Sequence, residues 1–295
     1  MRSIRRAVSR VSAELGRYAH GADRQAIRRE LAREAFFRAA GRFTPTVEVE
    51  WASGRYLVAT ADRDVSRVTF MVGPYGLETL RRAVQLMGLH GHAPVAGREV
   101  LEIGANIGTT TIPLVHEFGA AHVHAFEPSP VNYRLLRQNV LANGLEASVT
   151  TYEMAVSDRD GKLPFVSTPR NGGSSHVAAE SEATHFVPAL RVDALLERGT
   201  ITASRLGLVW IDVEGHEAAV LAGADLLGPV PIVIEYQPRL YRDVDRLNEL
   251  ITRRRGRVFD LSSGAEVSAS DLVGRNQAEA TDLLLLPAVD QALST

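Results

Sequence analysis

From residue 97 onward, short apolar runs alternate with stretches of helical composition. Parallel strands need a long crossover, usually a helix, so this alternation is typical of a parallel sheet covered on both faces. We expect an α/β fold with a doubly wound, seven-stranded, mostly parallel sheet of Rossmann-like type. The runs assigned to strands are EVLEIGA, AHVHAFEP, SVTTYEMAV, LGLVWIDV, PIVIEYQP, VFDLS and ATDLLLLP.

One intervening helix has clear signals at both ends. Ser129 is predicted as its N-cap, Pro130 takes the first helical position, and Asn143 with Gly144 ends it. Its apolar face consists of Val131, Leu135, Leu136 and Val140. These signals support the assignment of the strands on either side.

An accessory segment is predicted before the main domain. Residues 1–45 indicate two helices separated at residues 20–23, and residues 46–96 form a small β/α lead-in to a domain spanning 97–295. Alternation in VEVEW, RYLVAT and VTFMV predicts a small antiparallel element, followed by a helix from Gly76 to Leu89. The second N-terminal helix is expected to present one apolar face made of Ile27, Leu31, Ala35 and Phe36.

The first N-terminal helix is predicted to be amphipathic, with arginines away from its apolar stripe. The stripe consists of Ile4, Val8, Val11 and Leu15. We expect it to pack on the domain or on a second subunit, which would give a homodimer through these helices; an anionic membrane surface is the alternative. Its Arg and Ser content also fits a transit peptide, whereas the absence of a continuous apolar core argues against a secretory signal.

Composition excludes several classes of function. A chain of 295 residues with a formal net charge of -2 has no general attraction for nucleic acid, and we expect no nucleic-acid partner. No apolar run is long enough to span a bilayer, so we expect a cytoplasmic protein without a transmembrane segment. The absence of cysteine rules out disulfides, thiolate zinc sites and cysteine nucleophiles.

A glycine-bearing turn follows the first strand run, in the order strand, turn, helix, and contains Gly104, Ala105 and Gly108. Ligands of doubly wound folds bind beyond the carboxyl ends of the strands, where glycines allow close backbone approach. A dinucleotide site favours GxGxxG, but Asn106 and Thr109 replace two of those glycines. A turn without any ligand remains the alternative.

Two acids frame this predicted ligand site. Glu102, just before the turn, suits a cationic ligand such as S-adenosylmethionine, which carries an ammonium and a sulfonium. Glu127 closes the second strand run and suits the two ribose hydroxyls of an adenosine. Because nicotinamide sites share such an acid, a nicotinamide-dependent oxidoreductase remains an alternative.

A second chemical centre is predicted in IDVEGHE. Asp212 ends the fourth run, Glu214 and His216 follow, and Glu235 closes the next run, so their side chains are expected to meet at the strand ends. His216 is the candidate base for an acceptor hydroxyl because its ordinary pKa lies near cellular pH; Asp212 would orient it or take the proton, with Glu214 as a further catalytic candidate. Magnesium on these oxygens is a competing arrangement, less favoured, and we assign no metal ligand.

Residues 168–185, rich in Gly and Ser, are predicted to form a loop that can cover the site. Within it, Ser174, Ser175 and His176 are candidate substrate-binding residues, together with Glu235.

Taken in order, these motifs resemble the FkbM-type methyltransferases, within the class I S-adenosylmethionine-dependent fold. The resemblance spans Val65 to Pro238 and excludes the N-terminal helices. The motifs that carry it are LEIGANIG, FEPSPVNYRLLRQNVLANG, AVSDRDGKLPF, GGSSH, LRVDALL and VWIDVEGHEAAVLAGA.

The resemblance implies a cofactor site for S-adenosylmethionine. It implies that the methionine part meets Glu102, Gly104, Ala105, Asn106, Gly108 and Asp212. It also implies that Glu127 holds the ribose and that Ala155 and Val156 flank the adenine. The implied reaction is O-methylation of a hydroxyl on a sugar, glycoside or polyketide-type small molecule. An N-methyl or carboxylate acceptor, or a non-catalytic binding subunit of the same fold, remains an alternative.

Overall fold

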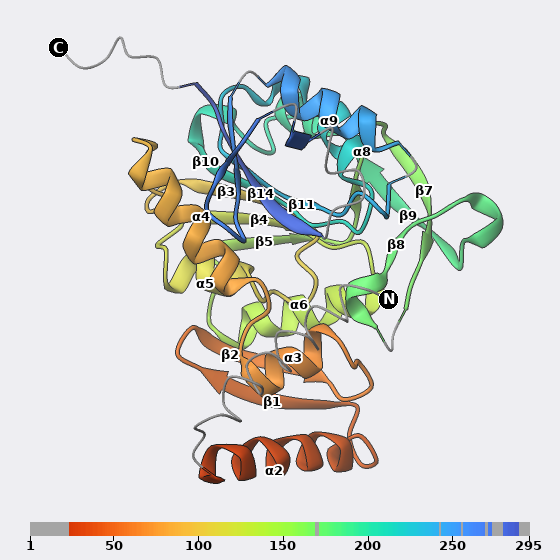
Figure 1. The fold of residues 1–295 in the computed structure, drawn as a ribbon. Coiled ribbons are helices and arrows are strands. Elements are labelled where there is room, and N and C mark those ends of the chain that lie inside the picture. The colour runs from red at the N-terminus through yellow and green to blue at the C-terminus, as the bar shows by residue number, and fades with distance from the viewer. Residues whose placement is uncertain are drawn as a thin grey trace.

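The computed structural model describes most of the chain as a large sheet flanked by helices, with a smaller N-terminal unit beneath it (Figure 1). The described residues are 24–168, 171–241, 243–254, 256–268, 271–272 and 280–288. The predicted first helix lies outside these residues, so its amphipathic packing and a homodimer through it remain predictions.

The main sheet has eight strands in the order β13-β12-β14-β11-β10-β3-β4-β5. The five strands from β11 to β5 are parallel, and β14, β12 and β13 continue the sheet with antiparallel pairs. Their bounds are β13 (Glu266–Val267), β12 (Arg257–Asp260), β14 (Thr281–Leu286), β11 (Ile232–Tyr236), β10 (Leu206–Ile211), β3 (Glu99–Ile103), β4 (His122–Phe126) and β5 (Val149–Tyr152). The predicted doubly wound, mostly parallel sheet is confirmed. Each of the predicted runs forms a strand. The eighth strand, β13, could not be predicted because its sequence contains no apolar run.

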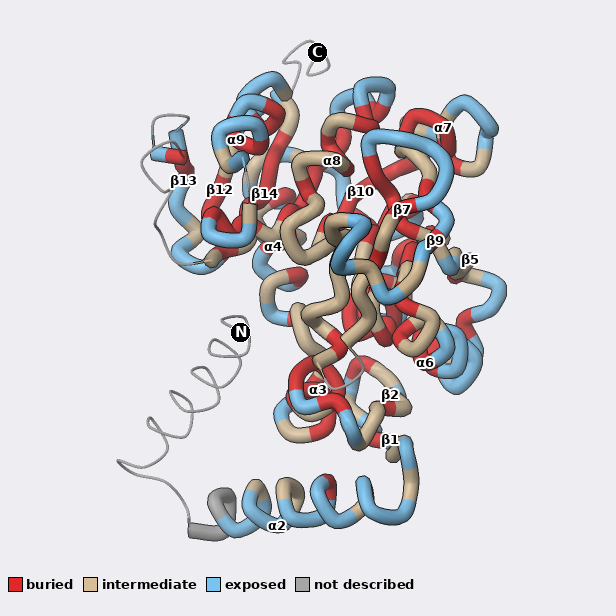
Figure 2. Tube along the Cα trace, turned by 90° about the vertical axis from the view of Figure 1, so that its right-hand side faces the viewer, coloured by how far each residue is buried: buried red, intermediate tan, exposed pale blue. Residues whose placement is uncertain are grey.

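Helices cover both faces of this sheet, because successive strand residues point to opposite sides. Val100 packs into one core cluster with α4, α5 and α6, whereas its neighbour Leu101 packs into a second cluster with α7, α8 and α9. These helices are α4 (Leu77–Leu89), α5 (Thr111–His116), α6 (Pro130–Ala142), α7 (Val192–Glu197), α8 (Glu217–Ala222) and α9 (Val244–Arg253). The central strands β10 and β14 are accordingly coloured mostly as buried in Figure 2.

The end signals of α6 are largely confirmed. Pro130 is its first residue, the helix ends at Ala142, and Gly144 adopts a left-handed φ of 66° just beyond it. Ser129 occupies the N-cap position, but its side chain makes no capping hydrogen bond.

The predicted antiparallel element is a hairpin of β1 (Thr46–Trp51) and β2 (Gly54–Ala59). The prediction that VTFMV is a third strand is wrong, because these residues belong to the helix α3 (Val65–Val72). The carboxylate of Asp62 accepts the backbone N–H groups of Asp64 and Ser66, each at 2.9 Å, which satisfies donors at the helix start. This local capping outweighs the strand preference of the β-branched residues.

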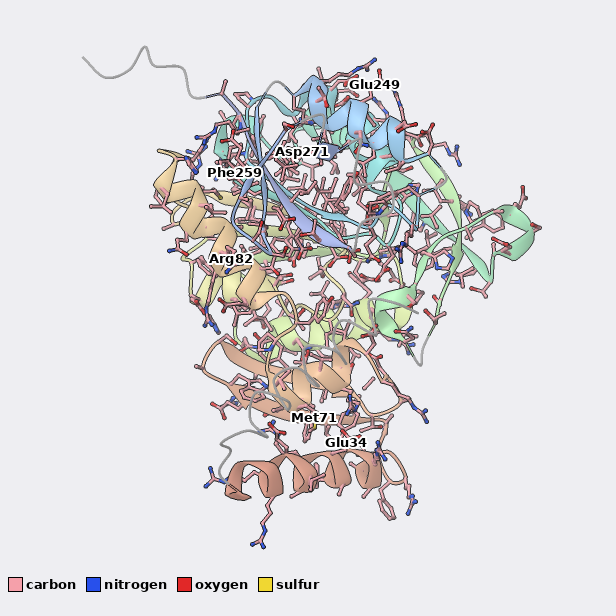
Figure 3. The ribbon with its side chains drawn as sticks, in the orientation of Figure 1. Glu34, Met71, Arg82, Glu249, Phe259 and Asp271 are labelled. Carbon is pink, nitrogen blue, oxygen red and sulfur yellow. The ribbon has the colours of Figure 1, made fainter. Side chains whose placement is uncertain are left out.

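The helix α2 (Arg24–Ala40) packs on α3 through a different face from the predicted one. Phe37 is buried and lies 5.0 Å from Phe70, measured between ring centroids, whereas Leu31 and Phe36 are 65% and 57% exposed. Glu34 accepts a hydrogen bond from the Arg67 side chain at 2.9 Å (Figure 3). Since an aromatic pair and an ion pair set the rotation of the helix, the apolar pattern alone could not reveal it.

The hairpin is attached to α6 through amide side chains. Asn139 accepts the backbone N–H of Leu57 at 2.6 Å and donates to its carbonyl oxygen at 3.1 Å. One helical turn later, Asn143 accepts the N–H of Arg55 at 2.9 Å and donates to its carbonyl oxygen at 2.7 Å. The two amides thus engage alternate residues of β2.

A second sheet, in the order β6-β9-β7-β8, stands beside the main one and supplies the expected covering segment. Its strands are β6 (Ala155–Val156), β9 (His185–Leu190), β7 (Gly161–Val166) and β8 (His176–Val177). Short 3-10 turns occur at η1 (Gly172–Ser174), η2 (Glu180–Glu182), η3 (Ala203–Arg205) and η4 (Asp225–Leu227). Residues 171–184 are therefore a loop interrupted by β8 and by the turns η1 and η2. None of the described helices is both long and apolar enough to cross a bilayer.

Candidate functional site

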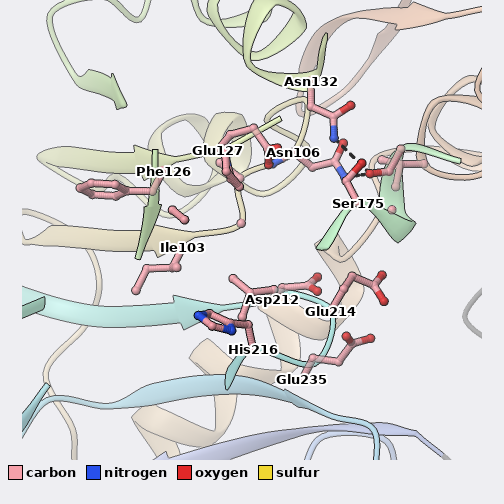
Figure 4. Close-up of a pocket in the computed structure, with 18 of the residues that line it drawn as sticks. Ile103, Asn106, Phe126, Glu127, Asn132, Ser175, Asp212, Glu214, His216 and Glu235 are labelled. Atoms are coloured by element: carbon pink, nitrogen blue, oxygen red, sulfur yellow. Dashed lines mark hydrogen bonds between the residues drawn. The ribbon is translucent and has the colours of Figure 1, made fainter. Parts of the chain in front are cut away.

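A pocket opens at the carboxyl ends of β3, β4 and β10, where doubly wound folds bind their ligands. The site residues predicted from the sequence that line it are Gly104, Ala105, Asn106, Glu127, Ala155, Val156, Ser175, Asp212, Glu214, His216 and Glu235. Figure 4 shows Asn106, Glu127, Asn132 and Ser175 on one side and the acids after β10 and β11 on the other.

The glycine turn brings the ends of β3 and β10 into contact. Gly104 has a φ of 92°, and a Cβ added there would lie 1.8 Å from the backbone oxygen of Asp212. The Asp212 N–H in turn donates to the Ile103 oxygen at 2.9 Å. Gly108, with a φ of 89°, lies outside the pocket wall, where a Cβ would meet Leu136 at 3.0 Å. Gly104 is thus required for close strand packing as well as for the pocket.

Glu127 is tied directly to this turn. Its Oε2 accepts the backbone N–H of Asn106 at 2.9 Å, and its Oε1 accepts the N–H of Ser129 at 2.8 Å. Asn106 has a φ of 52°, which aims its N–H at the carboxylate. Burial raises the pKa of Glu127 to about 7 despite these donors. The Asn132 side chain is a third hydrogen-bond partner, and the four lone pairs of a carboxylate still leave room for a ligand hydroxyl.

Glu102 lies behind the turn and outside the pocket wall. Its side chain is fully buried and accepts hydrogen bonds from the hydroxyls of Thr110 and of Thr111, the latter at 2.6 Å. Burial raises its pKa to about 7. In this structure Glu102 therefore supports the start of α5, and its expected contact with an ammonium remains a prediction.

The neighbouring wall is apolar and flat. Phe126 stacks on Tyr152 with ring centroids 4.3 Å apart, and Phe126 lines the pocket with Ala155 and Val156. Such a surface suits a planar ring system.

Three acids converge on the opposite wall. Asp212 follows β10, Glu214 lies in the next turn with a left-handed φ of 51°, and Glu235 belongs to β11. One carboxylate oxygen from each lies within 4.8 Å of the other two.

All three acids have raised pKa values, first because of burial and then because of neighbouring carboxylates. The pKa of Asp212 is raised to about 8, with Asp282 and Glu217 adding to the effect, and that of Glu214 to about 9, with Asp212 as the next cause. The pKa of Glu235 is raised well above its ordinary value. At neutral pH these carboxyl groups therefore retain protons, and the Asp212 and Glu235 side chains form a hydrogen bond with each other.

His216 lines the same pocket but does not belong to the acid group. Its Nε2 lies 2.8 Å from the Ser157 hydroxyl, and that hydroxyl donates to Asp158 at 3.0 Å. Because the hydroxyl proton is used on Asp158, we assign the ring proton to Nε2, which leaves the lone pair on Nδ1. Burial lowers the pKa of His216 to about 4. His216 is therefore neutral at pH 7, with Nδ1 as the atom free to accept a proton. The expectation that its pKa lies near cellular pH is wrong, because burial makes this imidazole a weaker base than a free histidine.

The covering segment is fastened over the glycine turn. The Gly172 oxygen accepts the side-chain N–H of Asn106 at 3.3 Å and that of Asn132 at 3.1 Å, while its own N–H donates to Asp62 at 3.1 Å. Ser175 lines the pocket, whereas Ser174 and His176 do not. The His176 Nδ1 instead lies 2.8 Å from the Ser174 oxygen.

Sequence reasoning missed three polar contributors to the site. Glu217 is fully buried and accepts the N–H groups of Val213 and Gly215, which shapes the turn that carries Glu214. Its place at the helix start, where an acid commonly caps, was a usable signal. Asp64 and Asn132 reach the pocket from α3 and α6 through tertiary packing, for which the sequence has no local signal.

Relatives of the chain include two curated methyltransferases. Methyltransferase sdnD of Sordaria araneosa is 28% identical over 155 residues, covering 43% of this chain and 60% of that protein. The 31-O-demethyl-FK506 methyltransferase FkbM of Streptomyces tacrolimicus is 30% identical over 165 residues, covering 46% and 63%. The chain thus spans less than two thirds of the length of either relative.

Among solved structures, M. jannaschii TYW2 in complex with AdoMet overlays with a TM-score of 0.41 at 14% identity, covering 82% of this chain and 84% of that one. The family model for the methyltransferase FkbM domain matches residues 102–259, which include the glycine turn, Glu127, the acid group and β12. The chain therefore belongs to the FkbM methyltransferase family.

Proposed function

We propose that the protein is an S-adenosylmethionine-dependent methyltransferase that methylates a hydroxyl group of a small molecule. The observation that carries this proposal is the link between Glu127 and the glycine turn, in which a buried carboxylate at the end of β4 accepts the Asn106 N–H at 2.9 Å. A carboxylate in this position can accept ribose hydroxyls beside the backbone that would meet the rest of the cofactor, which supports the proposal.

The pocket residues fit the cofactor in three respects. Glu127 retains acceptor lone pairs for the ribose, and the flat wall of Phe126 and Val156 suits the adenine. The Oδ1 atom of Asn106 is buried and has no hydrogen-bond partner among the described residues, so a ligand donor is needed there. When bound, S-adenosylmethionine supplies a methyl group already activated on a sulfonium, so positioning the acceptor provides much of the acceleration.

The acceptor is proposed to be a hydroxyl of a sugar, glycoside or polyketide-type molecule. One relative is named for a 31-O-demethyl-FK506 substrate, which supports oxygen as the methylated atom. The new C–O bond forms as the C–S bond breaks with its electron pair on sulfur, and the hydroxyl proton must leave. His216 through Nδ1, or Asp212, is the candidate to take that proton.

Residues 171–175 are proposed to cover the cofactor once it is bound. Gly172 already spans Asn106, Asn132 and Asp62, and so joins the glycine turn to α6 and to the loop before α3. Opening this connection would admit the cofactor, and closing it would limit water in the pocket.

Calorimetry tests the proposal directly. Purified full-length protein should bind S-adenosylmethionine and S-adenosylhomocysteine, and Glu127→Ala should weaken both. NADH serves as the competing ligand, and absence of heat with millimolar S-adenosylmethionine would remove the proposal. Methyl transfer is then measured on a panel of hydroxylated sugars and macrolides with radiolabelled cofactor.

A further inference from the structure

We propose that Asp212, Glu214 and Glu235 hold a divalent cation with oxygen preference, of the magnesium, manganese and calcium class. The inference rests on the proposed function only for its role in catalysis, since the cation site itself is argued from the carboxylates. It adds a binding site on the wall opposite Glu127.

The geometry of the three acids matches a single ion. One oxygen from each carboxylate lies within 4.8 Å of the others. Ligand distances of about 2.1 Å for magnesium and 2.3–2.6 Å for calcium set an upper span of roughly 4.2–5.2 Å between oxygens on opposite sides of one ion. The observed group is therefore already within the span of calcium and close to that of magnesium.

A second observation concerns the carboxylate of Glu235. Its Oε1 accepts the side-chain N–H of Gln237, whereas its buried Oε2 accepts no hydrogen bond from any N–H or hydroxyl group of the described residues. The other polar group that the Glu235 side chain meets is the Asp212 carboxyl, which is itself an acid. Figure 4 shows this carboxylate pointing toward Glu214 and Asp212. A buried acceptor without a donor is costly, and a cation among the three acids would remove that cost.

Protein cations do not fill this role within the described part of the chain. None of its ion pairs involves Asp212, Glu214 or Glu235. The nearest basic side chain in the sequence, His216, directs its Nε2 to Ser157 instead. The backbone around Glu214 is also held in place, because Glu217 accepts the N–H groups of Val213 and Gly215 on either side of it.

A cation at this wall has a clear use in methyl transfer. The three acids and the glycine turn line one pocket. A cation bound by the acids would therefore have coordination positions open to the space in which an acceptor would bind. A hydroxyl oxygen bound there is held in place and loses its proton more readily. The cation therefore complements the base proposed above.

The test uses the full chain, freed of metal by a chelator, with Mn²⁺ as the probe. Electron paramagnetic resonance should show loss of the free Mn²⁺ signal at a single site per chain, and Mg²⁺ or Ca²⁺ should compete. Glu235→Gln and Asp212→Asn should each lower the affinity for Mn²⁺. Substitution of residues that only support the ligands of a metal typically costs roughly 10–100-fold in affinity, so loss of a ligand should cost at least as much. Glu99→Gln, a buried acid at the other end of β3, is the matched control and should bind Mn²⁺ normally.

Several results would overturn the proposal. These are no Mn²⁺ binding to the wild-type chain at millimolar metal, or binding unaffected in both variants. Displacement of Mn²⁺ by simple alkylammonium ions but not by Mg²⁺ or Ca²⁺ would reassign the wall to an amine. Circular dichroism verifies that each variant folds. S-adenosylhomocysteine binding in chelator separates the claims, because cofactor binding without Mn²⁺ binding rejects the cation alone, and the reverse rejects the proposed function alone.

Discussion

His216 and Ser157 are joined across the pocket floor by a 2.8 Å contact between Nε2 and the serine hydroxyl. Ser157 follows β6 of the second sheet, whereas His216 directly precedes α8, so the contact links the two sheets at the site. It fixes the orientation of the imidazole and leaves Nδ1 as the atom that can accept a proton.

His216→Gln is expected to lower kcat by about 10²–10⁴-fold, the usual contribution of a general base, while S-adenosylhomocysteine affinity changes little. Ser157→Ala keeps the imidazole but removes its tether, and should lower kcat less. Steady-state kinetics and calorimetry measure the two effects. Equal turnover in wild type and His216→Gln would move the base to another residue.

Cofactor affinity should rise with pH through neutrality because of Glu127. Burial raises its pKa to about 7, so the carboxylate is mostly protonated at pH 6 and mostly ionised at pH 8. The ionised form accepts ribose hydroxyls more strongly, and Glu127→Gln should weaken binding at pH 8 on the order of 10- to 100-fold. Calorimetric titrations across this range should show a steeper rise of affinity with pH for wild type than for the variant, in which only the other acids of the site, Glu102 and Asp212, still titrate. Parallel curves would contradict the assignment.

Glu102→Gln should make stability less sensitive to pH. Burial raises the folded-state pKa of Glu102 from 4.5 to about 7, so between these values the folded chain keeps a proton that the unfolded chain has lost. Stability therefore falls as pH rises from about 4.5 to about 7, by a total on the order of 3 kcal/mol. Urea unfolding at pH 5 and pH 8 measures the free energy of unfolding. Between these pH values the variant should lose less of it than wild type, so that the variant is relatively more stable at pH 8. Glu78→Gln, with its side chain 82% exposed, is the control, and a parallel loss in wild type and Glu102→Gln would refute the prediction.

Gly104→Ala is expected to destabilise the protein and abolish cofactor binding. The new Cβ would lie 1.8 Å from the Asp212 oxygen and would force the ends of β3 and β10 apart. Gly97→Ala separates this clash from backbone strain, because Gly97 also has a positive φ, of 75°, but nothing lies within 4 Å of its added Cβ. Thermal unfolding should show a much larger loss for Gly104→Ala. Similar losses in the two variants would mean that backbone strain, rather than the contact with Asp212, is responsible.

Asn132→Ala should loosen the covering segment. The variant removes one of the two side-chain donors to the Gly172 oxygen, so S-adenosylhomocysteine should dissociate faster and residues 168–185 should become more sensitive to protease. Asn143→Ala removes a comparable amide from the C-cap position of the same helix, away from the pocket, and should leave both rates unchanged. An unaltered dissociation rate in Asn132→Ala would show that Gly172 is not part of the closure.

The main sheet could be predicted because buried parallel strands read as continuous apolar runs, as in LGLVWI of β10. The second sheet was missed because β6 and β8 have two residues each, and because a proline interrupts the apolar pattern of both longer strands, β7 and β9. In the site, Glu127 and Asp212 could be placed because each ends a strand. The contact of His216 with Ser157, and that of Gly172 with Asn132, depend on how the second sheet lies on the first, which no local pattern encodes.

The attachment of the hairpin to α6 has a consequence for solubility. An exposed edge strand offers free N–H and C=O groups to any passing chain and is a template for aggregation. Asn139 and Asn143 occupy those groups on Leu57 and Arg55, since four residues of helix rise about as far as two residues of strand. The two amide side chains thus take the place of a neighbouring strand at the outer edge of β2, so this edge has fewer free groups with which another chain could pair.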